Sequence, residues 1–455
     1  MGQGAQMTTA LIVLAAGKGT RMQSDLPKVL HPLAGAPLLV HALTAGGAVD
    51  PECTVVVTGH GAEAVEKAAR DFDDRIACVR QTEQLGTAHA VAQAAPALEG
   101  FTGNAVVLYG DTPFITPETL ESMIAARSQH DVVVLGFRAA DPGRYGRLVM
   151  EGDQLAQIVE YKDADDATRA IDLCNSGVIC ADAATLFSLI DAVGNDNAAR
   201  EYYLTDIVGL ARAQGLTAGV VTCDESETLG INSRAELAAA EQQFQRTARA
   251  RAIADGVHMP APETVILAHD THIGADALVE PYVVFAPGVT VESGATIRAF
   301  SHLEGCHVSR GATVGPYARL RPGTELAEDA KVGNFVEIKS ALIDTGAKVS
   351  HLTYIGDAHV GAGANIGAGT VTCNYDGVFK HQTTIGAGAF IGSSTMLVAP
   401  VTVGAGAMTG SGSVITRDVP AGDLALGRAQ QVNKAGLGQR LMDKLKALKA
   451  AKQKA

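Results

Sequence analysis

One apolar residue recurs at every sixth position through most of the second half of the chain. The spacing slips to five at a few points, is interrupted over 367–384, and then resumes. Neither an α-helix, with 3.6 residues per turn, nor a hairpin array produces a period of six. A parallel β-helix does, because each hexad supplies one short strand and one corner, and the inward residues of successive coils stack. The predicted inward residues are Ile273, Val279, Phe285, Val291, Ile297, Leu303, Val308, Val314, Leu320, Leu326, Val332, Ile338, Ile343, Val349, Ile355, Val360, Ile366, Ile385, Ile391, Leu397, Val403, Thr409 and Ile415, of which only Thr409 is polar.

The composition agrees with an architecture that contains many tight corners. Glycine accounts for 50 of the 455 residues, aromatic residues are 4%, and Trp is absent. We expect glycine at the corners that need φ > 0 or a close backbone approach. The formal net charge of −13 disfavours a general binder of nucleic acid or of anionic membranes. An acidic protein can still hold an anion in a local basic pocket.

The sequence predicts a cytoplasmic protein that contacts no membrane. Apolar runs stay shorter than the roughly 20 residues needed to span a bilayer, and the polar N-terminal segment lacks the pattern of a signal peptide. The 7 cysteines are scattered without a Cys-x-x-Cys pair, which predicts reduced thiols and neither a zinc site nor disulfides. The basic tail from Arg440, which runs past Lys452 and Lys454, is expected to be frayed and solvated, with an amphipathic helix as the alternative.

The first half has the rhythm of a parallel sheet with helices on both faces. Ser233 and Glu236 form a capping box that opens a helix leaving this domain, and Gly256 ends it. These features predict three segments, at 1–232, 233–256 and 257–455. The predicted core strands are 11–16, 54–58, 105–109 and 132–137, the helices are 61–70, 87–98 and 117–128, and strands at 147–150, 157–161 and 178–180 are additions to that core.

A glycine-rich loop, Gly17-Lys-Gly-Thr-Arg-Met22, follows the first predicted strand. It matches neither the P-loop pattern nor the Gly-x-Gly-x-x-Gly fingerprint, because Met22 stands where the last glycine belongs. Backbone N–H groups after an apolar strand can still cradle phosphates, and Lys18, Arg21 and Lys28 add three cations. Taken alone, the loop suits either a phosphate site or a plain strand-to-helix turn.

Leu14–Met22, followed by Asp25-Leu-Pro-Lys28, resembles the signature of sugar-phosphate nucleotidyltransferases, and the hexads resemble left-handed β-helix acyltransferases. Together, over residues 10–430, the chain resembles the family of bifunctional N-acetylglucosamine-1-phosphate uridylyltransferases/glucosamine-1-phosphate N-acetyltransferases of bacterial cell-envelope synthesis. The resemblance implies a Rossmann-like α/β domain followed by a left-handed parallel β-helix. It also implies acetyl-CoA and UTP as substrates, Mg²⁺ as cofactor, and a homotrimer whose neighbouring subunits complete the acetyltransferase site.

The resemblance assigns roles in the first half. Asp111 and Asn232 are implied as Mg²⁺ ligands, although a lone Asp after a strand is more often a cap or turn residue. Lys28 is implied to contact the reacting phosphates. The other implied nucleotide and sugar contacts are Leu14, Ala15, Ala16, Gly17 and Arg21 for the triphosphate, Gln81, Gly86 and Thr87 for uracil, Tyr109 and Gly110 beside the metal, and Gly146, Glu160 and Asn175 for N-acetylglucosamine.

In the second half, His351 is implied as the general base that deprotonates the sugar amine. Without the resemblance, a lone His is more often a structural hydrogen-bonding residue, and Arg321 and Lys339 are expected on a solvated face. The resemblance implies instead that this cationic pair binds the sugar phosphate. The remaining implied contacts are Tyr354 and Asn365 with the sugar, Asn374 and Tyr375 facing the substrates, and Ala368, Ser393, Ser411 and Arg428 along acetyl-CoA.

Two alternatives stay open at the level of sequence. The β-helix could serve only to regulate a different sugar nucleotidyltransferase, as in ADP-glucose pyrophosphorylases. It could also be a trimerisation scaffold without chemistry, since its inward stacking would look the same. The outward constellation of His351, Tyr354 and Asn365 argues against both.

Overall fold

The computed structural model describes residues 8–453. The chain divides into two compact units, Met1–Ala248 and Arg249–Ala455. Helix α8 (Arg234–Ala254) spans this division, and the predicted boundaries after 232 and 256 lie near its two ends. At its start, Ser233 Oγ accepts the Glu236 N–H at 3.2 Å, but the Glu236 carboxylate accepts the N–H of Asn232 at 2.7 Å. The capping box is therefore displaced by one residue from its predicted form.

A nine-stranded mixed sheet forms the centre of the first unit. The long strand β10 (Leu173–Asp182) lies between β6 and β7 and runs antiparallel to both. The prediction of an all-parallel core with later strands as additions was therefore wrong at this position. The other strands along the sheet are β11 (Ala218–Cys223), β7 (Val132–Arg138), β6 (Asn104–Tyr109), β1 (Thr9–Ala15), β4 (Cys53–Thr58) and β5 (Ala77–Arg80), and the hairpin of β8 (Arg147–Glu151) and β9 (Gln154–Val159) joins β10.

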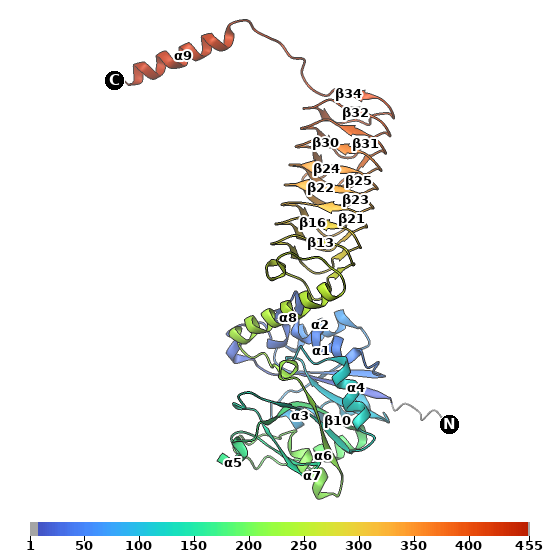
Figure 1. Ribbon diagram of the computed structural model, residues 1–455, viewed down its shortest axis with the longest axis vertical. Coiled ribbons are helices and arrows are strands. Elements are labelled where there is room, and N and C mark those ends of the chain that lie inside the picture. The colour runs from blue at the N-terminus through green and yellow to red at the C-terminus, as the bar shows by residue number, and fades with distance from the viewer. Residues whose placement is uncertain (1–7, 454–455) are drawn as a thin grey trace, which may run out of the picture. The chain divides into compact units, whose positions relative to one another are not determined.

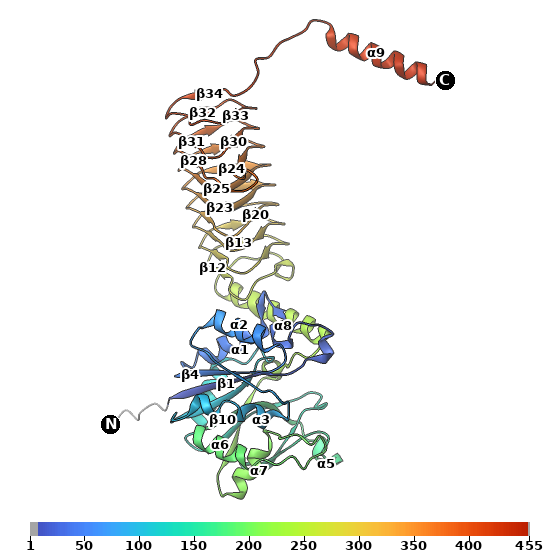
Figure 2. The ribbon, with the colours of Figure 1, turned by 180° about the vertical axis from the view of Figure 1, so that it is seen from behind.

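Helices cover both faces of this sheet, as predicted (Figure 2). Alternate strand residues point to opposite faces, so Ile12 joins one apolar cluster and Leu11 joins the other. The predicted helix over 87–98 ends at Ala92, because Pro96 has no N–H to donate to the Ala92 carbonyl, and a separate 3-10 turn follows at Ala95–Leu98. One face is covered by α1 (Leu38–Gly47), α2 (Ala62–Phe72) and α4 (Pro117–Ala126), and the other by α3 (Thr87–Ala92), α6 (Ala183–Asp191) and α7 (Asp206–Ala213), with short helices at Ala95–Leu98 and Asp166–Arg169.

The second unit is a stack of parallel coils with three faces (Figure 1). Residues of successive coils pair in register, as Ile273 does with Val291 and Ile297 with Val314, at separations of 18 and 17 residues. The first face holds β13 (Leu278–Val279), β16 (Thr296–Ile297), β19 (Thr313–Val314), β22 (Lys331–Asn334), β24 (Lys348–His351), β26 (Asn365–Ile366), β29 (Phe390–Ile391), β32 (Met408–Thr409) and β34 (Leu424–Ala425).

The second and third faces share two long strands, β23 (Glu337–Ile343) and β25 (Tyr354–Val360), which turn the corner between them. The second face also holds β14 (Val284–Phe285), β17 (His302–Leu303), β20 (Arg319–Leu320), β27 (Val371–Cys373), β30 (Met396–Val398) and β33 (Val414–Ile415). The third also holds β12 (His272–Ile273), β15 (Thr290–Val291), β18 (Cys306–Val308), β21 (Thr324–Leu326), β28 (Thr383–Ile385) and β31 (Val401–Val403).

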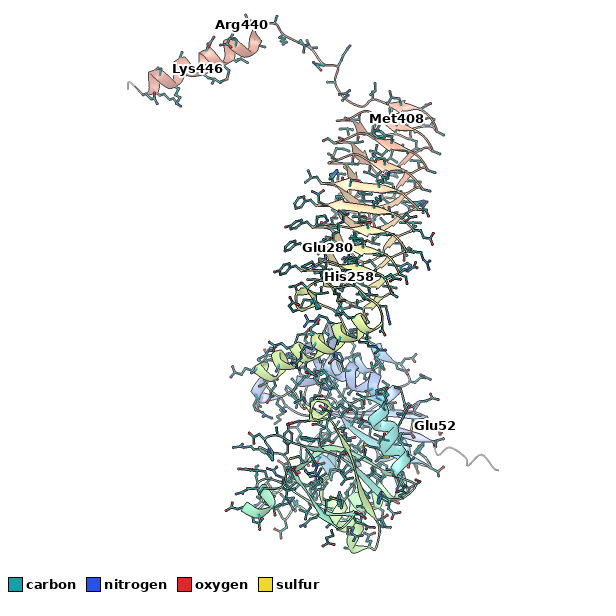
Figure 3. The ribbon with its side chains drawn as sticks, in the orientation of Figure 1. Glu52, His258, Glu280, Met408, Arg440 and Lys446 are labelled. Atoms are coloured by element: carbon teal, nitrogen blue, oxygen red, sulfur yellow. The ribbon has the colours of Figure 1, made fainter. Side chains whose placement is uncertain are left out.

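The predicted inward positions are the buried residues of these strands. From Val279 to Ile415 each is at most 4% exposed, and Ile273, in the first coil of the stack, is partly exposed. Outward neighbours alternate with them, so that Met408 is 45% exposed beside buried Thr409 (Figure 3). The Thr409 hydroxyl is satisfied inside the stack, where it accepts the Gly392 N–H at 3.0 Å.

Bulky residues occupy left-handed corners between the first and second faces. Tyr282, Phe300, Tyr317 and Phe335 have φ of 62°, 60°, 54° and 56°, although glycine was expected at such positions. Their exposed rings stack with centroids 5.0, 4.9 and 5.3 Å apart. We call these four residues the aromatic ladder. Ring stacking offsets part of the cost of the left-handed backbone.

The basic tail forms helix α9 (Leu437–Lys452), in which no residue is buried. The expectation of a solvated tail is therefore confirmed for this helix, whereas that of a frayed end is wrong there. Lys454, which was part of the same prediction, lies outside the described residues. Within residues 8–453, no helix is long and apolar enough to cross a bilayer.

Candidate active sites

A cavity of about 670 Å³ opens at the carboxyl ends of β1 and β6. Parallel neighbouring strands end at the same edge of a sheet, so loops far apart in sequence meet there. The predicted residues that line this cavity are Leu14, Ala15, Ala16, Gly17, Lys28, Gln81, Gly86, Thr87, Tyr109, Asp111 and Asn232.

Lys28 lies at the centre of the polar contacts in this cavity. Its Nζ donates to the Asp111 carboxylate and to Asn232 Oδ1, the latter at 2.9 Å. The Lys28 and Asp111 side chains are only 14% and 15% exposed. The Ile231 N–H donates to the Asp111 carbonyl at 3.0 Å, which holds the neighbouring Asn232 beside Asp111.

This arrangement suits a divalent cation. One carboxylate and one amide oxygen already converge on a positive charge, that of the Lys28 ammonium. Mg²⁺ takes few protein oxygens, keeps several waters and completes its shell with substrate phosphates. The donor set of Asp111 and Asn232 therefore fits Mg²⁺ by chemistry. Among the residues described, no group of three or more His, Cys, Asp or Glu side chains could hold a metal.

Two glycines give the loops of the cavity their shape. Gly19 has φ of +58°, and a Cβ there would lie 2.6 Å from Cβ of Lys28, so glycine lets that lysine approach. Gly86 has φ of +120°, and a Cβ there would lie 2.5 Å from the Tyr202 carbonyl oxygen. The neighbouring Thr87 Oγ1 accepts the Leu204 N–H at 3.0 Å. Both loops are therefore held by contacts that a larger residue would break.

The predicted uracil and phosphate contacts differ in their exposure. Gln81 is 4% exposed, and its Nε2 donates to the Gly86 carbonyl at 3.1 Å. Arg21 is exposed on a short 3-10 helix, Thr20–Met22, and does not line the cavity. The loop after β1 therefore continues into a single helical turn.

Burial and the negative charge of Asp111 raise the pKa of the Tyr109 hydroxyl, which stays a neutral donor.

The predicted sugar contacts form a second cluster within the first unit. The Asn175 N–H donates to the Gly146 carbonyl at 2.9 Å. A Cβ on Gly146 would lie 3.5 Å from Oε1 of Glu160. Gly146 directly precedes β8, Glu160 directly follows β9 and Asn175 lies in β10, so the hairpin and β10 bring the three residues together. Burial raises the pKa of Glu160, whose Oε1 accepts from Thr205 at 3.3 Å. These three residues do not line the 670 Å³ cavity.

In the second unit, His351 and three predicted acetyl-CoA contacts stand in one column. Each stands two residues after an inward residue of the first face, and those inward residues pair in register from coil to coil. The column lies just before the left-handed corner and follows the axis of the stack, at about 4.8 Å per coil. It consists of His351, Ala368, Ser393 and Ser411, and the exposed Arg428 follows the next position.

The second face carries a cluster of cations. Arg321 and Lys339 each follow an inward residue, and those inward residues, Leu320 and Ile338, are in register. Arg321 also pairs with Glu337, with 2.8 Å between Nη1 and Oε1. Contact with the Lys380 ammonium lowers the pKa of Lys339, with burial and the charge of Arg321 as further causes. Mutual repulsion among three cations favours the binding of an anion.

Tyr354 and Asn374 meet over a glycine beside this cluster. The Asn374 amide donates to Asp357 and lies 3.5 Å from the Tyr354 hydroxyl. A Cβ on Gly356 would lie 2.3 Å from that hydroxyl, so glycine makes room for it. The other predicted contacts of this site are Tyr375, which is 60% exposed, and Asn365 on β26.

Sequence reasoning missed two residues of this unit. Lys380 lies in the insertion that interrupts the hexads, where its backbone forms an antiparallel β-bridge with Tyr375. The only signal for Lys380 in the sequence was its position in this insertion. Asn334 lies directly before His351 in the column, with 2.7 Å between its Oδ1 and the imidazole Nδ1. A register drawn from the hexads would have paired these two residues.

Both units match described families. Residues 11–254 match the MobA-like NTP transferase domain. Residues 270–305 and 382–417 match the six-repeat hexapeptide of bacterial transferases. With its parallel coils of hexads, the second unit is a left-handed parallel β-helix.

Relatives match the chain along nearly its whole length. A protein of Cereibacter sphaeroides is 70% identical over 447 residues, which are 98% of each chain. One from Jannaschia sp. is 66% identical over 445 residues, again 98% of each chain. One from Roseobacter denitrificans is 65% identical over 448 residues, 98% of this chain and 100% of that one. All three are named "Bifunctional protein GlmU". The chain therefore belongs to the GlmU family of bifunctional enzymes, which combine a nucleotidyltransferase with an acetyltransferase.

Proposed function

We propose that this protein makes UDP-N-acetylglucosamine in two steps, as a precursor of peptidoglycan and lipopolysaccharide. The second unit acetylates glucosamine-1-phosphate with acetyl-CoA. The first unit then couples N-acetylglucosamine-1-phosphate with UTP and releases pyrophosphate. The observation that carries this proposal is the identity of 65–70% to bifunctional relatives across both units.

In the first unit, the sugar phosphate oxygen attacks the α-phosphorus of UTP, and pyrophosphate leaves. This nucleophile is already anionic, so the reaction needs no general base. Positioning and charge neutralisation then supply the rate. Gly17 and its loop hold the triphosphate with Arg21, Lys28 contacts the reacting phosphates, and Gln81 with Thr87 reads the uracil. The cluster of Gly146, Glu160 and Asn175 holds the sugar.

Asp111 and Asn232 would hold Mg²⁺ in the complex with substrate. A bound ion would supply charge neutralisation and orientation for the phosphates. The convergence of both side chains on the Lys28 ammonium supports this assignment. Lys28 is then free to contact the phosphates.

In the second unit, His351 is the general base. The sugar amine is mostly ammonium near neutral pH and must lose a proton before it attacks the thioester, a proton that a neutral imidazole accepts. Arg321 and Lys339 bind the sugar phosphate, and the cation cluster with Lys380 supports this role. The further contacts are Tyr354, Asn365, Asn374 and Tyr375 for the sugar, and Ala368, Ser393, Ser411 and Arg428 for acetyl-CoA.

The working form is a cytoplasmic homotrimer assembled through the β-helix, in which neighbouring subunits complete the acetyltransferase site. The hexapeptide repeats support oligomerisation. The exposed aromatic ladder, which lies at the same corner in the coils that precede the column of His351, offers apolar area for such a contact.

Product analysis of one reaction tests the proposal. The purified protein is incubated with glucosamine-1-phosphate, acetyl-CoA, UTP and Mg²⁺. UDP-N-acetylglucosamine, free thiol and pyrophosphate should all appear, and omission of acetyl-CoA should stop the formation of the first product. Pyrophosphate formation from supplied N-acetylglucosamine-1-phosphate without any acetyl transfer would favour a β-helix that only regulates or assembles.

A further inference from the structure

The side chain that orients His351 comes from the preceding coil. Asn334 and His351 are Cα partners in the ladder between β22 and β24. Their side chains approach to 2.7 Å, between the amide Oδ1 and the imidazole Nδ1. Adjacent strands are about 4.8 Å apart, a spacing that these two short side chains bridge with one hydrogen bond.

The backbone holds both residues in place. The Leu352 N–H donates to the Asn334 carbonyl at 3.1 Å, and the Phe335 N–H donates to Tyr317 at 3.1 Å. Both residues are followed directly by a left-handed corner, at Phe335 with φ of 56° and at Leu352 with φ of 50°. The two side chains therefore leave the stack at the same height in their coils and in the same direction.

The contact determines which nitrogen of His351 can act as a base. An amide oxygen only accepts hydrogen bonds, so Nδ1 must carry the proton that it receives. In a neutral imidazole the other nitrogen, Nε2, then has the free lone pair. A carboxylate in the same place would also stabilise the imidazolium, whereas an amide orients the ring without adding charge.

We propose that Asn334 is a positioning residue for the acetyl transfer, which holds His351 in the tautomer with its proton on Nδ1. This inference rests on the proposed role of His351 as general base. Nε2 accepts a proton from the sugar ammonium, and the freed amine forms the C–N bond with the acetyl carbon. The C–S bond then breaks, and the second proton of the nitrogen goes to the thiolate sulfur. Imidazolium returns its proton to solvent.

Substitution in the full-length enzyme tests this role. In Asn334→Ala, kcat for acetyl transfer should fall by roughly 10- to 100-fold, a share of the about 10²–10⁴ that a positioned base supplies. KM for glucosamine-1-phosphate should change little, because Arg321 and Lys339 bind its phosphate. Lys331→Ala, an exposed change on the same strand β22, is the matched control and should leave kcat unchanged.

Two readouts distinguish positioning from a merely structural role. The ¹⁵N spectrum of histidine-labelled enzyme should show His351 protonated at Nδ1, with the signal assigned by its loss in His351→Gln. This signal should move towards the other tautomer in Asn334→Ala. Asn334→Asp should keep the Nδ1 proton but shift the acid limb of the acetylation pH–rate profile to higher pH, because a carboxylate stabilises the imidazolium.

The outcomes separate this inference from the proposed function. Two outcomes would overturn the role of Asn334 and leave the general-base assignment intact. One is a wild-type His351 that is protonated at Nε2. The other is full acetylation by Asn334→Ala when His351→Ala is inactive. An active His351→Ala would overturn the general-base assignment itself. Uridylyl transfer in the same preparations reports on the folding of the chain. If the alanine variant fails to fold, the pH profile of the near-isosteric Asn334→Asp decides.

Discussion

At the scale of single residues, Lys28 has two tasks that exclude each other. In the structure its ammonium occupies the oxygens of Asp111 and Asn232, and in the proposed reaction it contacts phosphates. Two cations cannot share one carboxylate in a site that is only about 15% exposed without strong repulsion. Metal binding and release of the lysine from Asp111 must therefore be coupled.

Removal of this lysine should strengthen metal binding and weaken catalysis. Without nucleotide, Lys28→Ala should bind Mn²⁺ about tenfold more tightly than wild type, because a charge-assisted hydrogen bond of about 1.5–3 kcal/mol no longer competes. Electron paramagnetic resonance of free Mn²⁺ measures this affinity, while uridylyl transfer should be severely impaired. Lys67→Ala, which removes an exposed charge on α2, is the control. Equal or weaker Mn²⁺ binding by Lys28→Ala would contradict the coupling.

At the scale of elements, one corner of the β-helix absorbs every change of the hexad spacing between Val279 and Ile415. The steps of five residues, such as Ile338 to Ile343 and Ile355 to Val360, all fall between the second and third faces. The insertion that carries Asn374, Tyr375 and Lys380 leaves the stack at the same corner. The corner between the first and second faces keeps a constant length, so the column of His351 and the aromatic ladder stay aligned.

The aromatic ladder should invert the usual preference for alanine over glycine. Phe300 has φ of 60° and stacks on both Tyr282 and Tyr317. Phe300→Ala loses the stacking and keeps the left-handed strain, whereas Phe300→Gly loses the stacking but relieves the strain. The glycine variant should therefore be the more stable of the two by about 1 kcal/mol. Acetyl transfer that survives in increasing urea measures this order. A less stable glycine variant would show that the corner carries no strain.

An ion pair ties α2 to β5 and should make their stability depend on pH. The hydrogen bond from Arg80 lowers the pKa of the buried Glu66, so its carboxylate is favoured in the folded state. This stabilisation is complete above the ordinary pKa of 4.5 and is lost as the pH falls through the lowered, folded value. At pH 7, Glu66→Gln should therefore protect the amides of α2 and β5 less from hydrogen exchange. The difference from wild type should shrink as the pH falls through that lowered value, and Glu63→Gln on the same helix is the control. A difference that does not change as the pH is lowered would mean that packing, not charge, is lost.

At the scale of the whole molecule, the two sets of residues lie in separate compact units. The residues proposed for uridylyl transfer lie in Met1–Ala248, and those proposed for acetyl transfer in Arg249–Ala455. Only the first unit presents the Asp111 and Asn232 pair that suits a divalent cation. Loss of one reaction should therefore leave the other reaction intact.

Substitution and chelation should separate the two activities. Asp111→Ala should abolish uridylyl transfer and leave acetylation largely intact, and His351→Ala should do the reverse, by about 10²–10⁴ in rate. EDTA should silence only the reaction with UTP. Parallel assays of thiol and pyrophosphate release measure both. Equal loss of both activities in a folded variant, or acetylation that returns only with Mg²⁺, would contradict independent sites.

The hexad pattern by itself determined the β-helix, because a residue stacked between coils must be apolar or, as at Thr409, find its partner within the stack. The strands of the sheet were likewise readable from apolar runs. Their order was not, since the antiparallel insertion of β10 depends on pairing between distant segments. The same holds for contacts across coils and loops. Lys28 meets Asp111 and Lys380 meets Lys339 only because tertiary folding brings together residues that no local pattern relates, whereas the hexad register already relates Asn334 to His351.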